Sequence, residues 1–182
     1  MSTIIGGSSP SITFSDSTTQ TTAFTGSASQ ITSGTLPSAQ LPTGSVLQVV
    51  QATASSASTS STSFVTTGLT ASITPKFSTS KILVIVSLAE VNVSASNKNA
   101  TSTIYRNGSN IAPSGSGIHQ AFAAIYAGNS ILTANQNYSY LDSPATTSAI
   151  TYTIYFATES GATVTMGINS TTSYIQLLEV AA

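Results

Sequence analysis

The side chains that could perform acid–base or nucleophilic chemistry are few in this sequence. The chain has no cysteine, one histidine (His119), and five carboxylates: Asp16, Glu90, Asp142, Glu159 and Glu179. His119 and Asp142 could join one of many serines in a Ser-His-Asp arrangement. The chain has no G-x-S-x-G elbow, however, and its abundance of serine makes any such match uninformative. We therefore expect His119 to be an ordinary strand or loop residue.

Glu90 and Glu159 are the second combination that could do chemistry. A glycosidase needs two carboxyl groups about 5–10 Å apart, and nothing in the spacing of these two brings them together. Glu90 ends an apolar run, and Glu159 sits in a turn before Gly161. The chain has too few His, Asp and Glu residues for a metal motif, and it has no phosphate loop. We expect a protein that is not an enzyme, with no catalytic residue, cofactor or metal.

The composition excludes further classes of function. Charged residues make up 5% of the 182 residues, against about 25% in a typical soluble protein, while Ser and Thr make up about a third. Four Lys and Arg against five Asp and Glu give a net charge of −1, so no basic surface exists for nucleic acid or anionic lipid. The longest aliphatic run, Ile82 to Val86, is far shorter than the ~20 apolar residues that span a bilayer. Nucleic-acid binding and membrane insertion are therefore not expected.

The elements that must position any site fall into two parts, and the first is residues 1–44. No charged side chain occurs from Ser17 to Pro75, and residues 17–45 lack a sustained apolar period, so this part cannot bury a core alone. Residues 11–24 allow two short strands around a turn near residues 15–17. The two Leu-Pro pairs of residues 36–42 force extended geometry. We expect an extended, Ser/Thr-rich docking arm.

Such an arm becomes ordered only where something holds it. We expect neighbouring chains or a partner surface to bind it through its isolated hydrophobic residues. These candidate partner-docking anchors are Ile4, Ile5, Ile12, Phe14 and Phe24.

Residues 45–182 form the second part and have the patterns of β-strands. Val65 to Ile73 alternates apolar and polar residues, and so does the stretch that follows Ile150. Lys81 to Val93 is apolar on both parities, which indicates a strand buried on both faces, or by the core on one face and by a subunit on the other. Asn107-Gly108 predicts a type I′ hairpin. Further strands are expected at residues 45–51, 138–141, 162–168 and 174–180, and residues 118–126 fit a strand or a helix.

Seven to nine short strands without a long amphipathic helix predict an all-β fold, an antiparallel β-sandwich of jelly-roll type, over residues 45–182. Its surface would carry Ser, Thr, Asn and Gln in place of charge. Charge-poor edge strands are templates for aggregation, and a closed oligomer would cover them. We therefore expect a homo-oligomer. The seven tyrosines are expected to be half-buried packing residues, with stacking on sugars as the alternative.

Several segments resemble those of tailed-bacteriophage virion proteins, especially tail fibres and related appendages. ITFSDSTTQTTAF (12–24) resembles a recurring element near the amino side of fibre modules. LPTGSVLQVVQ (41–51), followed by residues 62–88, resembles the start of a carboxy-terminal β-sandwich module. Later strands of such a module are resembled by STIYRNGSNIA (102–112), SYLDSP (139–144) with ITYTIYF (150–156), and SYIQLLEVAA (173–182).

The resemblance implies a non-enzymatic virion structural protein on the surface of a phage particle. It implies a homotrimer, attached to tail or capsid proteins by the arm, with a host-surface glycan as a further candidate partner of the sandwich. Because only a short arm precedes the sandwich, a short tail fibre, a head fibre and a capsid cement protein all remain open. A carbohydrate-binding adhesin is a more distant alternative.

Overall fold

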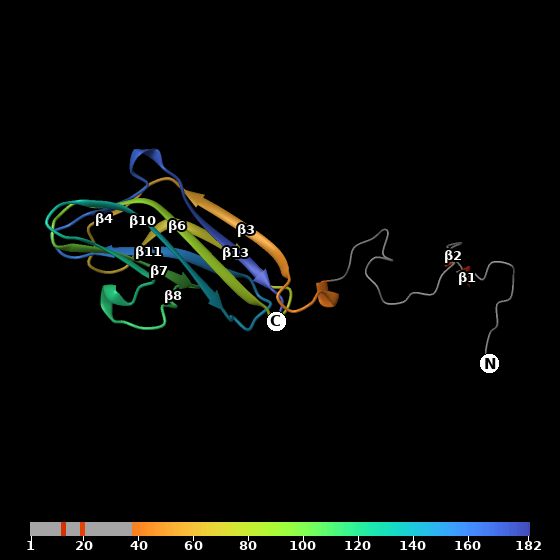
Figure 1. Cartoon of the computed structure of the whole chain (residues 1–182). Coiled ribbons are helices and arrows are strands. Elements are labelled where there is room, and N and C mark those ends of the chain that lie inside the picture. The colour runs from red at the N-terminus through yellow and green to blue at the C-terminus, as the bar shows by residue number, and fades with distance from the viewer. Residues whose placement is uncertain (1–11, 14–18, 21–37) are drawn as a thin grey trace. The chain divides into compact units, whose positions relative to one another are not determined.

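The computed structural model describes residues 12–13, 19–20 and 38–182 (Figure 1). The chain divides into two units, Met1–Gln40 and Leu41–Ala182. In the first unit, β1 (Ile12–Thr13) pairs antiparallel with β2 (Thr19–Gln20), and η2 spans Ser38–Gln40. The predicted pair of short strands around residues 15–17 is therefore confirmed.

The second unit contains eleven strands and two short 3₁₀ helices in the described residues. In chain order they are β3 (Val46–Ala54), β4 (Ala57–Thr59), β5 (Val65–Ile73), β6 (Lys81–Val93), β7 (Lys98–Arg106), β8 (Ser109–Asn110), η3 (Gly117–His119), β9 (Ala123–Ala127), β10 (Leu132–Asp142), β11 (Ile150–Thr158), β12 (Val164–Met166), η4 (Ile168–Ser170) and β13 (Ser173–Val180).

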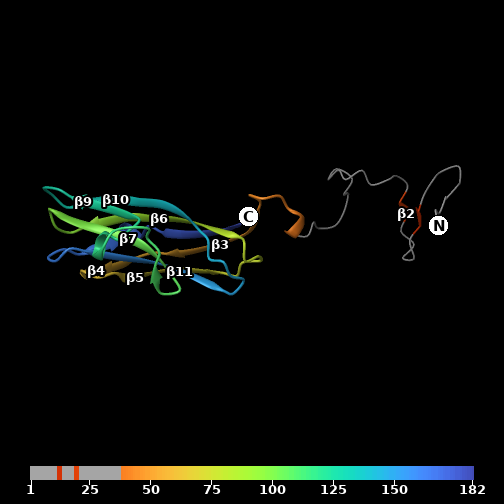
Figure 2. The ribbon, with the colours of Figure 1, turned by 90° about the horizontal axis from the view of Figure 1, so that it is seen from below.

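The strands form two antiparallel sheets. One has the order β3-β13-β6-β10, with β12 and β4 continuing beside the far end of β6. The other has the order β5-β11-β7, with β9 and β8 both on the free side of β7. The eight main strands are β3, β5, β6, β7, β9, β10, β11 and β13. Numbered 1 to 8 along the chain, they have the orders 1-8-3-6 and 2-7-4-5, which is the interleaved order of a jelly roll. Figure 2 shows β6 and β10 in one layer and β5 and β11 in the other.

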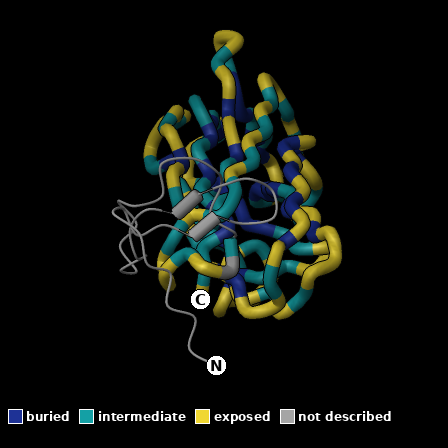
Figure 3. Tube along the Cα trace, turned by 90° about the vertical axis from the view of Figure 1, so that its right-hand side faces the viewer, coloured by how far each residue is buried: buried dark blue, intermediate teal, exposed yellow. Residues whose placement is uncertain are grey.

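The core lies between the two layers and is built by period-two alternation. On β6 the inward residues run from Ile82 through Val84 and Val86 to Leu88, and each is at most 1% exposed. On β11 the inward residues Ile150, Tyr152 and Ile154 meet them from the other sheet. Figure 3 shows this alternation as buried and exposed bands along the strands. The predicted all-β sandwich is therefore confirmed.

Local turns follow the sequence signals. Asn107 and Gly108 connect β7 to β8 as a two-residue loop, and both have positive φ (48° and 84°) as a type I′ turn requires. The predicted hairpin is confirmed. Residues 118–126, which fitted either a strand or a helix, contain the end of η3 and most of β9.

Two strands differ in length from the prediction. β10 is longer than the expected residues 138–141, because its inward positions include polar Gln136 and Asp142, which hide the alternation. β12 is shorter than the expected residues 162–168, because Gly167 takes a left-handed conformation with φ 68° and turns the chain into η4.

Candidate functional site

The two carboxylates considered as a glycosidase pair are used separately. Glu90, at an irregular position of β6 with φ 45°, accepts hydrogen bonds from Asn169 Nδ2 and Thr171 Oγ1, both 3.3 Å long. Glu159 Oε2 accepts the backbone N–H of Asn99 at 2.9 Å. Each carboxylate thus holds a local loop or strand end, and neither is hydrogen-bonded to the other within the described residues.

Asp142 is the centre of a buried polar network at the end of β10. Its two carboxylate oxygens accept hydrogen bonds from Arg106 Nη1 at 2.9 and 2.8 Å, and the Tyr152 hydroxyl donates to Oδ2 at 2.7 Å. The backbone N–H of Ser143 donates to Oδ1. Burial, together with the hydrogen bond to the Asp142 carboxylate, raises the pKa of Tyr152 well above its ordinary value. The network joins β7, β10 and β11.

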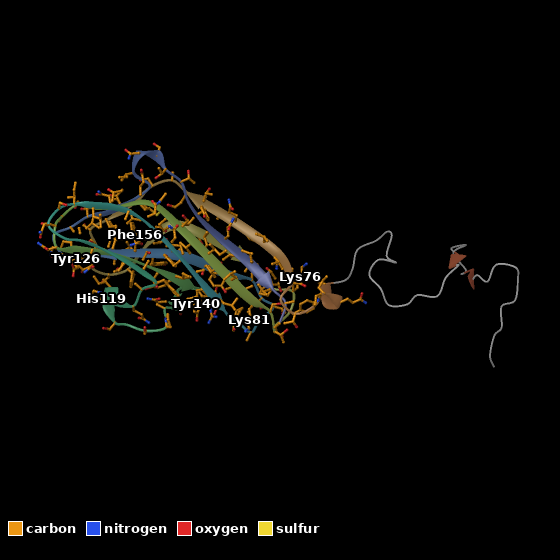
Figure 4. All side chains as sticks on the ribbon, in the orientation of Figure 1. Lys76, Lys81, His119, Tyr126, Tyr140 and Phe156 are labelled. Atoms are coloured by element: carbon orange, nitrogen blue, oxygen red, sulfur yellow. The ribbon has the colours of Figure 1, made fainter. Side chains whose placement is uncertain are left out.

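His119 is not part of that network. It ends η3, is exposed, and lies on the loop between β8 and β9 (Figure 4). Both oxygens of Asp142 are already occupied by Arg106, Tyr152 and Ser143. The structure therefore does not bring His119 and Asp142 together as a catalytic dyad.

Glu179 is a second buried carboxylate, fully buried at the end of β13. Its oxygens accept hydrogen bonds from Gln48 Nε2 at 2.6 Å and from the backbone N–H of Lys76 at 2.7 Å. Burial alone would raise the pKa of Glu179, but the hydrogen bonds outweigh burial and hold the pKa below its ordinary value. The carboxylate ties the loop after β5 to strands β3 and β13.

A shallow pocket of about 230 Å³ lies on the outer side of the β5-β11-β7 sheet. It is lined by Thr62, Ser63, Phe64, Tyr105, Asn110, Gly117, Ile118 and Gln120. The ring of Tyr105 stacks on that of Tyr155 with centroids 3.9 Å apart, and Phe64 meets it edge-on at 6.3 Å. Burial raises the pKa of Tyr105, and the neighbouring Tyr155 raises it further.

The loop between β8 and β9 forms the rim of this pocket, and the Asn110 side chain ties its two ends together. Asn110 Nδ2 donates to the Gln120 carbonyl at 2.8 Å, and Asn110 Oδ1 accepts from Thr103 Oγ1 and the Ala112 N–H. Gly115 has φ 103°, and a Cβ there would overlap the His119 carbonyl oxygen. The loop can therefore close on itself only with glycine at this position.

The lining of the pocket defines the ligand that it suits. It combines aromatic rings with hydroxyl and amide groups, and no lining residue is charged. Aromatic faces pack on apolar ligand surfaces while a few polar groups fix orientation. A neutral polar molecule with an apolar face, such as a sugar ring, has this chemistry. The two aromatic residues of the lining, Phe64 and Tyr105, come from separate segments of the chain, and for this reason the sequence pattern did not group them.

The remaining predictions concern the docking anchors, metal ligands and membrane-spanning segments. Of the candidate docking anchors, Ile12 lies in β1, while Ile4, Ile5, Phe14 and Phe24 lie outside the described residues. The part of the chain that the structure describes holds no group of three or more potential metal-ligating His, Asp or Glu residues. Among its helices, none has the length and apolar character needed to cross a membrane.

Comparison with known proteins adds no family to this description. No protein-family model matches the chain, and the search of curated proteins also finds no match.

Proposed function

We propose that the chain is a non-enzymatic structural protein of a bacteriophage particle. In this proposal it is a short trimeric fibre, attached to tail or capsid proteins by its N-terminal arm, and its sandwich contacts the host surface. The resemblance of its segments to phage appendage proteins supports the particle assignment, and the jelly-roll sandwich is compatible with it.

The observation that carries the contact role is the uncharged aromatic pocket beside Tyr105. A sandwich that reads a host glycan needs a surface site that binds neutral polar rings, and this pocket has that lining. The buried carboxylates Asp142 and Glu179 also favour a structural role, because both oxygens of each accept hydrogen bonds within the fold.

Glycan binding by the full chain tests the contact role. We expect the wild-type chain to bind one group of glycans on an array and Gln120→Ala to weaken that binding at least about five-fold, since about 1 kcal/mol is a typical net hydrogen-bond contribution. Tyr126→Ala is the matched control, because Tyr126 is 56% exposed and does not line the pocket. A blank array, or equal binding by Gln120→Ala, would count against the pocket.

Particles that lack the protein test the assignment to a fibre. Fibre loss should block adsorption and leave heads intact. Fragile heads with normal adsorption would instead indicate a capsid cement protein, and absence of the chain from purified particles would contradict a virion role.

A further inference from the structure

The outer face of the β3-β13-β6-β10 sheet carries an apolar row that nothing in the described residues covers. The strand register places Val49, Leu178, Leu83 and Leu141 directly beside one another, one from each strand. They stand on the outer face, because the residues that alternate with them on β13 and β6, such as Leu177 and Val84, are fully buried in the core. Val49 is 58% exposed and Leu141 is 48% exposed.

Flanking rows extend this surface. On one side lies Val46, 51% exposed, with Val180 and Lys81. On the other side Gln51, Gln176, Ile85 and Ser139 form the next row, in which Gln176 Nε2 donates to Gln51 Oε1 at 2.6 Å. We call the set Val46, Val49, Leu83, Ile85, Leu141, Leu178 and Val180 the apolar face.

The outer face of the other sheet provides the comparison. There the outward positions of β5 and β11, apart from Gly68 and Tyr155, are Ser or Thr. Two pairs bond across the strands: Thr70 to Thr153 and Ser72 to Thr151, both at 2.8 Å. Such hydroxyl side chains can face water without cost, whereas aliphatic side chains stabilise a protein only when they are removed from water. The contrast between the two outer faces marks the apolar face as a contact surface.

A hollow of about 410 Å³ adjoins the apolar face on the same side of the sheet. It is lined by Ile85, Val86, Ser87, Asn137, Tyr138, Ser139 and Tyr174. Small side chains on β6 and β10 leave this space beside the 37% exposed ring of Tyr174. A partner surface can therefore place a side chain into the hollow while it covers the apolar row.

We infer that the apolar face binds a second copy of this chain. This inference names the surface for the self-association that the proposed fibre requires, and it rests on that proposal for the number of copies. The character of the face favours a copy of itself. Among the described residues, the charged side chains beside it are Lys81 in the end row and Lys76, whose Nζ donates to the Leu47 carbonyl on β3, and the face offers no carboxylate to select a charged partner.

The area of the outer face of this sheet also fits a subunit interface. Because β12 and β4 lie beside the far end of β6, the sheet is about four strands wide along the thirteen residues of β6. At about 4.8 Å per strand and about 3.3 Å per residue, its outer face measures roughly 800 Å². A standard protein interface buries about 800 Å² per partner, with an apolar centre and a polar rim. The aliphatic rows supply the apolar part, and the Gln, Ser and Asn positions supply the polar part. The aromatic pocket lies in the other layer, so that this association leaves it open.

The molecular mass of the full chain in solution tests the inference, measured by light scattering after size exclusion at micromolar concentration. We expect the wild type to be a multiple of 18.4 kDa and Val49→Asp to shift to the monomer mass. Thr66→Asp is the matched control, since Thr66 is also an exposed β-branched residue on an edge strand, β5, and its Oγ1 accepts only the Gly68 N–H, which Asp can also accept. It should keep the wild-type mass. A monomeric wild type, or an unchanged mass for Val49→Asp, overturns the inference.

A second measurement covers the case in which Val49→Asp fails to fold. Because the chain has no cysteine, Val49→Cys and Thr66→Cys each carry a single thiol whose reaction rate with a maleimide can be followed. We expect Val49→Cys to react at least ten-fold more slowly than Thr66→Cys in the assembled protein. Equal rates overturn the inference. Slow reaction in a monomer also overturns it, because another segment of the same chain then covers the face.

These outcomes separate the inference from the proposed function. An oligomer that is absent from phage particles leaves the apolar face as the subunit interface and removes the fibre assignment. A monomer found on particles removes the apolar face as a subunit interface and leaves the virion role.

Discussion

Removing the carboxylate of Asp142 should destabilise the sandwich more than removing any exposed carboxylate. In Asp142→Ala the hydroxyl of Tyr152, a residue with no exposed surface, loses its only hydrogen-bond acceptor. An orphaned buried polar group costs about 1–3 kcal/mol. The ion pair adds about 1 kcal/mol or less, because the Arg106 side chain is 34% exposed and can be rehydrated. We expect a total loss of about 3 kcal/mol in the free energy of unfolding.

Equilibrium urea unfolding followed by circular dichroism measures this loss, at one fixed protein concentration. Tyr152→Phe alone should cost about 1 kcal/mol, because Asp142 keeps its hydrogen bonds from Arg106 and Ser143. In the Tyr152→Phe background no hydroxyl is orphaned, so Asp142→Ala should then cost only about 1 kcal/mol. Glu159→Ala is the control and should cost less than about 1 kcal/mol, since Glu159 accepts a single backbone hydrogen bond.

Two results would refute this reasoning about Asp142. One is a cost of Asp142→Ala below about 1 kcal/mol, the typical net value of a single hydrogen bond. The other is an equal cost in both backgrounds, which would mean that the Tyr152 hydroxyl is satisfied without Asp142.

Three further predictions concern pH and backbone. The pKa of Glu179 is lower in the folded than in the unfolded chain, so as the pH falls the Glu179 carboxylate is protonated first in the unfolded chain. The stabilisation of the fold by ionised Glu179 is therefore present above the ordinary pKa of about 4.5. It is lost as the pH falls through the lower pKa of the folded protein. Glu179→Gln should therefore show a shallower loss of melting temperature between pH 5 and pH 3, and an unchanged slope would contradict this. The pKa values of Tyr105, Tyr138 and Tyr152 are raised by burial, so absorbance at 295 nm should show fewer than seven tyrosines ionising at their ordinary pKa before alkaline unfolding. Ionisation of all seven at the ordinary pKa in the native protein would argue against the raised pKa values. Gly167→Ala should lower stability by at least about 2 kcal/mol, since its Cβ would overlap the Ser55 carbonyl oxygen, whereas Gly161→Ala, with φ 85° and nothing within 4 Å, should cost less in the same urea assay.

The sandwich was predictable where alternation and burial agree. Val65 to Ile73 and Lys81 to Val93 are strands with the predicted limits, because each presents a continuous apolar set to the core. β10 was only partly predictable. Its inward Gln136 is buried through hydrogen bonds with Ser102 and with the Ala100 carbonyl, and such pairing of polar groups across the core leaves no apolar period in the sequence.

The surfaces depend on which residues the register brings side by side. That Lys81 to Val93 is apolar on both parities predicted a strand buried on both faces, or by the core on one face and by a subunit on the other. The structure shows the core on one face, and the alternate positions are partly exposed. The row that joins Leu83 to Val49, Leu178 and Leu141 could not be predicted without the strand order, which places β13 and β10 on either side of β6. The same holds for the stacking of Tyr105 on Tyr155, which requires β7 and β11 to be neighbours.

A reconstruction of purified phage particles by electron cryomicroscopy tests the proposed function most directly. The account predicts density for a trimer of jelly-roll sandwiches that projects from the particle surface, with the β3-β13-β6-β10 faces turned toward one another. Absence of the chain from purified particles would contradict the virion role. Single sandwiches spread over the capsid lattice would contradict the fibre and its subunit interface together.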